Sequence, residues 1–128
     1  MTISFDAQTV VEELVADNDP PYLQVAMADA TGAHYLMLHR SQPFDDPEDW
    51  GVYIEVDDQL LSGYDCVASC ELTPERLVVR TTKPLGQSKL VEVIEVRFAD
   101  GGRPSPEMIA RLRAIFTGCE DRLRIHAA

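Results

Sequence analysis

The segment 22-YLQVAMADATGAHYLML-38 decides the fold of this 128-residue chain. Its two ends, Tyr22–Ala28 and His34–Leu38, are rich in the residues that strands favour. The spacer between them, Asp29–Ala33, is rich in turn-forming residues and has a length that joins the strands of a hairpin. The segment therefore predicts a β-hairpin and, with it, an antiparallel sheet.

Further strands are expected on both sides of this hairpin. Cys66–Leu72 and Arg76–Thr82 flank Thr73-Pro74-Glu75, where proline favours a type I turn, and so predict a second hairpin. Leu90–Phe98 predicts a strand with a bulge, because its apolar positions change phase. Weaker patterns indicate a strand at Thr2–Phe5, a strand or a helical turn at Thr9–Val15, and a short last strand or a tail at Arg122–His126.

One helix is expected near the C-terminus. Ser105-Pro106-Glu107 combines an N-cap oxygen, a first-turn proline and an acid that the helix dipole favours. Apolar residues then recur at helical spacing, namely Met108, Leu112, Ile115 and Cys119. No repeat or linker divides the chain, so residues 1–128 are expected to form a single domain. The expected fold class is α+β: mostly antiparallel β-sheet built of hairpins, with one C-terminal amphipathic helix packed on it.

Composition and charge exclude several classes of function. The chain has 45% hydrophobic residues, and its 22 acidic and 11 basic residues give a net charge of -11. This charge repels phosphates, which argues against nucleic acid or an anionic membrane surface as a partner. No apolar run approaches the roughly 20 residues that cross a bilayer. An odd number of cysteines and no secretory signal lead us to expect a cytoplasmic protein.

The acidic residues are concentrated in the first half of the chain. Residues 1–64 contain 13 acids and a single base, Arg40, whereas residues 65–128 contain 9 acids and 10 bases. Within Ser41–Glu75, ten acids occur without a Lys or Arg, interleaved with Phe44, Trp50 and Tyr53. A solvated face that keeps the protein soluble would explain the acids alone. The aromatic residues favour a binding surface for a cationic protein.

The acidic segment is expected to form one two-sided patch. Gln42–Asp49 contains prolines and acids, which is typical of an exposed loop, and Val52–Val56 alternates apolar and polar positions. Val52, Ile54 and Val56 should face inward. The expected partner-binding residues are Asp45, Asp46, Glu48, Asp49, Trp50, Tyr53, Glu55, Asp57 and Asp58. Two alternatives stay open: Trp50 would instead be a core residue, and Glu55, Asp58 and Gln59 would instead fix the turn toward Tyr64.

Catalytic, metal and nucleotide sites find little support in the sequence. Gly101-Gly102-Arg103 lacks the other glycines and the lysine of a phosphate-binding loop. Cys66 and Cys70 would lie about 13 Å apart on one strand, too far to share an ion, and are expected in the core. His34 and His39 are expected to be ordinary strand or surface histidines. We expect a protein that is not an enzyme and that has no metal or cofactor.

The segment 45-DDPEDWGVYIEVDDQLLSGYDCVASCELTPERLVVRT-81 resembles the immunity protein 10 family. These are small cytoplasmic proteins of bacterial polymorphic toxin systems, inferred to neutralise a cognate toxin domain. The resemblance extends over Tyr22–Phe116. The matching elements are Glu48-Asp49, Tyr53-Ile54-Glu55, Asp58-Gln59, Tyr64, the Leu72–Val79 hairpin, the strand Tyr35–Leu38 ending in Arg40, and the helix Leu112–Phe116.

The resemblance implies a binder whose partner is a toxin domain. The chain itself is expected to be a monomer or a homodimer, since an exposed edge strand could pair with the toxin or with another copy of the chain. Basic toxin domains that act on nucleic acid would suit an acidic binding face, which competes with phosphates and speeds association. An acidic secretion chaperone that holds an effector segment is the alternative. A small-molecule enzyme or carrier is the third reading, and it requires a concave site with converging polar groups.

Overall fold

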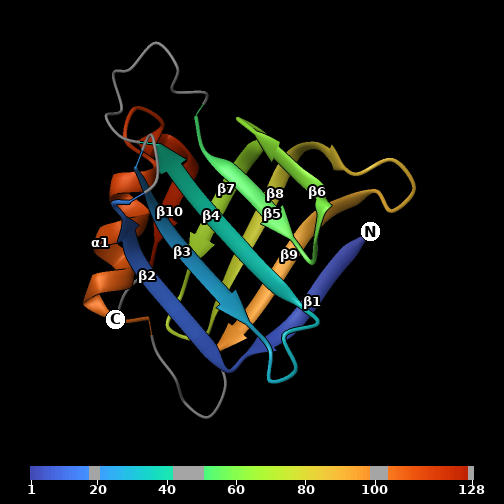
Figure 1. Ribbon diagram of the computed structural model, residues 1–128, viewed down its shortest axis with the longest axis horizontal. Coiled ribbons are helices and arrows are strands. Elements are labelled where there is room, and N and C mark those ends of the chain that lie inside the picture. The colour runs from blue at the N-terminus through green and yellow to red at the C-terminus, as the bar shows by residue number, and fades with distance from the viewer. Residues whose placement is uncertain (18–20, 42–50, 99–103, 127–128) are drawn as a thin grey trace.

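The computed structural model describes residues 1–17, 21–41, 51–98 and 104–126, and Figure 1 shows their arrangement. The strands are β1 (Thr2–Ala7), β2 (Thr9–Val15), β3 (Tyr22–Ala28), β4 (Tyr35–Ser41), β5 (Tyr53–Val56), β6 (Asp58–Tyr64), β7 (Val67–Leu72), β8 (Arg76–Leu85), β9 (Val91–Phe98) and β10 (Leu123–Ile125). The helices are α1 (Pro106–Ile115) and the 3-10 turn η2 (Glu120–Arg122). The fold class is α+β, as the sequence predicts.

The strands form two five-stranded sheets, a division that the sequence did not predict. The β2–β6 sheet has the order β2-β3-β4-β5-β6, and the β1–β10 sheet has the order β1-β9-β8-β7-β10. The chain leaves one sheet for the other at Gln8, between β1 and β2. Neighbouring strands are antiparallel, except that β1 pairs with β9 and β10 pairs with β7 in parallel. The β2–β6 sheet thus comes entirely from the acidic first half of the chain.

Both predicted hairpins are confirmed. The β3–β4 pair runs from Tyr22 opposite Ser41 to Ala28 opposite Tyr35, and the backbone N–H of Asp29 donates to the His34 carbonyl at 3.0 Å to close the turn. In the β7–β8 hairpin, the hydroxyl oxygen of Thr73 accepts from the backbone N–H of Arg76 at 3.2 Å. Short polar side chains that bond the nearby backbone in this way are the reason these residues specify turns.

Two strands, β6 and β9, depart from regular alternation of buried and exposed residues. The phase change expected in Leu90–Phe98 is present, because Val91, Ile94 and Val96 are buried and the β8–β9 register shifts between Arg80 and Leu85. Strand β6 was not predicted. Its first three residues, 58–60, are all exposed, so no apolar alternation marks its start.

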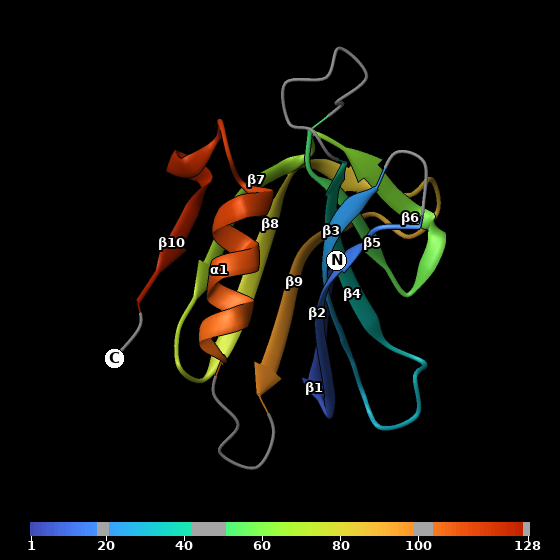
Figure 2. The same cartoon turned by 60° about the vertical axis from the view of Figure 1, so that its left-hand side comes forward.

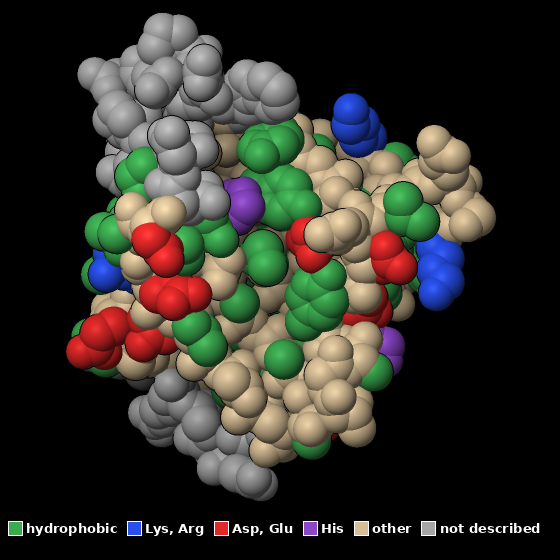
Figure 3. Space-filling view, in the orientation of Figure 1, with side chains coloured by type: hydrophobic (Ala, Val, Ile, Leu, Met, Phe, Trp, Pro, Cys, Tyr) green, Lys and Arg blue, Asp and Glu red, His purple; other side chains and the backbone are tan. Residues whose placement is uncertain are grey.

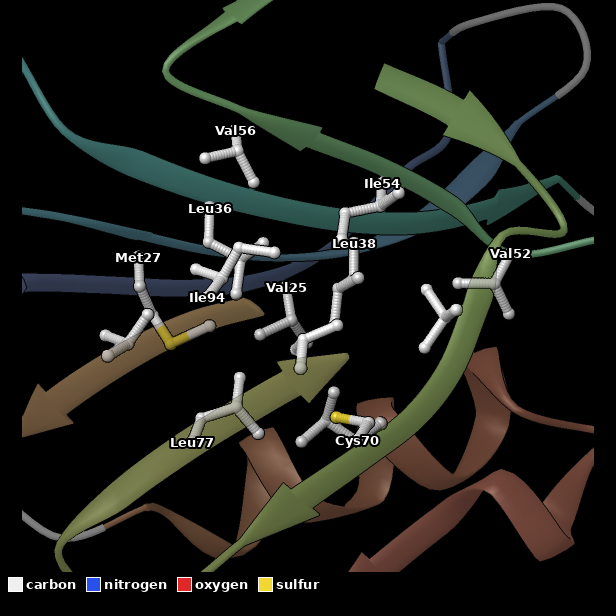
Figure 4. Close-up of a cluster of buried hydrophobic side chains, with 14 of the residues drawn as sticks. Val25, Met27, Leu36, Leu38, Val52, Ile54, Val56, Cys70, Leu77 and Ile94 are labelled. Atoms are coloured by element: carbon white, nitrogen blue, oxygen red, sulfur yellow. The ribbon is translucent and has the colours of Figure 1, made fainter. Parts of the chain in front are cut away.

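The core lies between the two sheets. Val52, Ile54 and Val56 are buried, as predicted, and so are Cys66 and Cys70. Figure 4 shows side chains from β3, β4 and β5 facing side chains from β7, β8 and β9, among them Val25, Leu36, Leu38, Ile54, Cys70, Leu77 and Ile94. Because one face of each strand packs into this core, the alternate residues of the β2–β6 sheet point outward.

Helix α1 begins where the sequence predicts. The Ser105 hydroxyl accepts from the backbone N–H of Met108 at 3.0 Å, as an N-cap does. The apolar stripe contributes Met108, Leu112 and Ile115 to the core. Figure 2 shows α1 between β10 on one side and β2 and β3 on the other, and it contacts β2, β3, β4 and β10. No helix of the described residues is long and apolar enough to cross a membrane.

A buried arginine joins the β2–β6 sheet to the end of α1. Arg40 on β4 is 9% exposed, and its Nη1 donates to the carbonyl of Ile115 at 3.1 Å and to the carbonyl of Thr117. A cation suits this position because the C-terminus of a helix carries partial negative charge and unpaired carbonyls. Arg40 is also the one base among residues 1–64. Its burial therefore removes the positive charge of this half from the surface.

Candidate partner-binding face

The outer face of the β2–β6 sheet is rich in aromatic and apolar side chains. Figure 3 looks onto this face and shows hydrophobic side chains gathered at its centre, acidic ones among them, and Lys and Arg toward its rim. The outward positions of β3 and β4 are half-buried rather than exposed: Tyr22, Gln24, Ala26, Ala28, Tyr35, Met37, His39 and Ser41. A face of this composition is typical of a surface that binds protein.

An aromatic row, formed by Tyr22, His39, Tyr53 and Tyr64, crosses this face from β3 to β6. The ring centroids of successive members lie 4.5, 4.3 and 5.0 Å apart. The register places Tyr53 directly opposite both His39 and Tyr64. Together with Tyr35, the row brings all four tyrosines of the chain onto one face. Tyrosine is enriched in interfaces because a rigid ring with a polar tip gives contact area at little entropic cost.

Glu55 was predicted as an electrostatic contact on the outer face, with a structural role as the alternative, and the structure buries its side chain on that face. Glu55 is 8% exposed. Both of its carboxylate oxygens accept hydrogen bonds, Oε1 from the Tyr53 hydroxyl at 2.5 Å and Oε2 from the Tyr35 hydroxyl. Burial, and then the hydrogen bonds to Glu55, raise the pKa of both tyrosines. The hydroxyls therefore stay protonated and donate. Glu55 faces outward as expected, but neighbouring tyrosines shield it.

His39 lies in the middle of the aromatic row. Its ring stacks on Tyr53 and tilts against Tyr22, and its Nδ1 is buried without a hydrogen-bond partner among the described residues. Burial lowers the pKa of His39, with the charge of Glu55 as a smaller opposing influence. The imidazole is therefore neutral near pH 7 and acts as one more aromatic ring of the face.

Asp57 lies between β5 and β6, and Asp58 is the first residue of β6, so neither belongs to the outward strip of β5. Asp57 has a φ of 62°, which takes it out of the strand alternation, and its Oδ2 lies 2.8 Å from His34 Nδ1 while Oδ1 accepts from the Tyr35 backbone N–H at 3.0 Å. Asp58 is exposed, and its Oδ1 accepts from the Leu60 backbone N–H at 2.9 Å. This bond to the nearby backbone is consistent with the turn-fixing role considered for Asp58, and its assignment as a partner contact stays a prediction.

The remaining predicted contacts cannot be placed on this face. Asp45, Asp46, Glu48, Asp49 and Trp50 lie outside the described residues. Their assignment to the partner-binding surface, and the choice between anchor and core for Trp50, stay predictions.

Acids on the two sheets have different partners. On the β1–β10 sheet, Arg97 binds Asp6 at 2.7 Å and Glu95 at 3.0 Å, and Arg76 binds Glu95 at 3.0 Å. On the β2–β6 sheet, the acids bind neutral groups: Glu13 accepts from the Gln24 amide at 3.1 Å, and Glu55 accepts from tyrosines. Within the described residues, no Lys or Arg forms an ion pair with Glu13 or Glu55. The negative charge of this face is therefore not neutralised by neighbouring bases.

A cavity of about 550 Å³ opens beside this face, where three turns meet. It is lined by Ala33, His34, Asp57, Asp58, Leu60, Leu61, Gly86, Gln87, Ser88 and Lys89. The His34 ring stacks on Phe5 with centroids 6.0 Å apart. This is a concave polar site of the kind that the small-molecule alternative requires, but Asp57 already occupies His34 Nδ1. Within the described residues, no group of three or more His, Cys, Asp or Glu is arranged to hold a metal ion.

Sequence reasoning missed Tyr22, Tyr35, His39 and Tyr64 as parts of one face. Each is an unremarkable residue on its own strand, and only the register of four strands brings the rings together. The sequence did contain one signal, the alternation of side chains along a strand, which places Tyr35 and His39 on one face of their strand and Tyr53 and Glu55 on one face of theirs. Comparison of the chain with protein-family models, curated proteins and solved structures finds no match.

Proposed function

We propose that this protein is a cytoplasmic immunity protein that binds a cognate bacterial toxin domain and neutralises it through the outer face of the β2–β6 sheet. The observation that supports this most directly is the gathering of all four tyrosines on a face whose acids lack basic partners within the described residues. Half-buried rings provide anchors for a partner, and uncompensated carboxylates select a basic one.

A basic toxin domain suits this face for a physical reason. A domain that acts on nucleic acid presents a positive cleft to the phosphate backbone, and an acidic protein face competes for that cleft. Long-range attraction speeds the encounter, whereas the aromatic anchors slow dissociation. Association is therefore expected to be fast and to slow as salt is added, because exposed charges are screened.

The proposal is tested by co-expression with the toxin domain encoded beside this protein. Host-cell survival that depends on this protein, together with a complex that co-elutes on a sizing column, would support it. Cell death and separate elution, with both proteins folded, would contradict it. The matched variants are Glu13→Gln, which removes an exposed acid of β2 on this face, and Glu92→Gln, which removes an exposed acid of the other sheet. The first should slow association, and the second should not.

One observation favours the secretion-chaperone alternative. The edge strand β2 leaves Val10, Val11 and Leu14 at 38, 38 and 47% exposure. An exposed apolar edge can pair with an extended segment of another chain. The state of the bound partner distinguishes the two functions. A chaperone binds an unstructured segment, whereas an immunity protein binds a folded domain and abolishes its activity.

A further inference from the structure

Glu55 is a carboxylate in aromatic surroundings. Both of its oxygens accept hydrogen bonds, one from the Tyr53 hydroxyl and one from the Tyr35 hydroxyl. Its exposure of 8% means that water solvates it poorly. A charge in such a place is costly unless a counter-charge is near.

The described residues supply no counter-charge to Glu55. No described Lys or Arg pairs with it, and His39, the histidine that feels the charge of Glu55, has its pKa lowered by burial and is neutral near pH 7. Arg40 lies on the neighbouring strand β4, but its guanidinium binds the carbonyls of Ile115 and Thr117 on the inner side of the sheet. By contrast, the carboxylate of Glu95 on the other sheet is held by Arg76 and Arg97. A cation brought by a partner would fill this gap.

The surroundings of the carboxylate favour a guanidinium over an ammonium ion. A guanidinium is flat, is weakly hydrated and stacks on aromatic rings, whereas an ammonium is a compact and strongly hydrated charge. The rings of Tyr35, Tyr53 and the rest of the aromatic row provide the stacking surface. Each carboxylate oxygen has two lone pairs and gives one to a tyrosine hydroxyl, so each can accept one more donor.

We propose that Glu55, with Tyr35 and Tyr53 beside it, binds the guanidinium group of an arginine side chain presented by the partner. The inference rests on the proposed function, because the toxin domain would supply the arginine. It specifies one chemical group of the partner, a guanidinium, that the binding face recognises. It also gives Glu55 a role in binding although its side chain is largely buried.

A small-molecule probe tests the site without the toxin domain and without any variant. N-acetyl-arginine amide is titrated into the protein while the aromatic NMR signals of the tyrosines are followed. We expect saturable shifts of Tyr35 and Tyr53 with this probe and none with N-acetyl-citrulline amide, which has the same shape without the charge. Equal shifts with the two probes, or no saturable shift with either, would overturn the inference.

The complex provides the second test. Glu55→Gln keeps the size and one acceptor oxygen of the side chain, and Glu92→Gln removes one exposed acid from the other sheet as a control. We expect Glu55→Gln to raise the Kd for the toxin domain by about tenfold or more, and Glu92→Gln to leave it unchanged. A complex that forms equally well with Glu55→Gln overturns the arginine site and leaves the proposed function standing. Selective binding of the arginine probe without any complex overturns the function and retains the site.

Discussion

Replacing Arg40 by methionine tests the link between the β2–β6 sheet and α1. Methionine has a similar length and fills the buried space, but it cannot donate to the carbonyls of Ile115 and Thr117. A hydrogen bond from a charged group contributes about 1.5 to 3 kcal/mol, and losing it leaves a carbonyl to be solvated again. Since Thr117 is exposed and regains water, we expect a total loss of about 3 kcal/mol. The partial negative charge at the C-terminus of α1 also favours the guanidinium, so losing the cation adds to the loss of stability.

The loss is measured by urea and thermal unfolding. An unfolding entropy of about 2.1 cal/mol/K per residue gives about 270 cal/mol/K for this chain, so about 3 kcal/mol lowers Tm by about 11 °C. Arg80, exposed on β8, is the matched control, and Arg80→Met should change stability by less than about 0.5 kcal/mol. A loss below about 1 kcal/mol for Arg40→Met would refute the reasoning, because the buried guanidinium would then contribute no more than a surface hydrogen bond.

Three further predictions concern pH, backbone strain and thiols. Burial lowers the pKa of His39, so as the pH falls below about 6.5 the unfolded state takes up a proton before the folded state does, and stability falls. In thermal unfolding, His39→Phe should lack this pH-dependent loss of stability. At Gly86, with a φ of +88°, a Cβ would lie 2.5 Å from a side-chain carbon and 2.6 Å from a carbonyl oxygen, so Gly86→Ala should cost about 2 kcal/mol or more in urea unfolding. At Gly32 a Cβ would meet nothing within 4 Å, so Gly32→Ala should cost about 1 kcal/mol. Burial raises the pKa of Cys70 to about 12, so mass spectrometry after brief iodoacetamide treatment of the folded protein should find Cys119 alkylated and Cys70 intact; prompt alkylation of Cys70 would contradict its burial.

Local signals predicted the parts of the fold that local chemistry determines. The turn residues near Asp29 and Thr73 and the N-cap Ser105 act within a few residues of themselves, and the structure confirms the elements they specify. The division into two sheets depends on which strands pair across the chain. The parallel pairing of β1 with β9, some ninety residues apart, leaves no local mark.

The site shows the same limit. The alternation of residues 52–56 correctly placed Tyr53 and Glu55 on the outer face, but alternation does not reveal whether neighbouring side chains shield that face. The shielding of Glu55 comes from Tyr35, twenty residues away on another strand. The interior position of Arg40 likewise depends on helix carbonyls 75 and 77 residues further along.

The dissociation rate of the toxin complex formed by Tyr53→Ala tests the central claim most directly. Tyr53 lies in the aromatic row between His39 and Tyr64, whereas Leu90 is 49% exposed and immediately precedes β9 of the other sheet. If the outer face of the β2–β6 sheet binds the partner, Tyr53→Ala should dissociate about 30-fold faster than wild type, which corresponds to about 2 kcal/mol, and Leu90→Ala should dissociate at the wild-type rate. A Tyr53→Ala complex that remains folded and dissociates as slowly as wild type would contradict the claim.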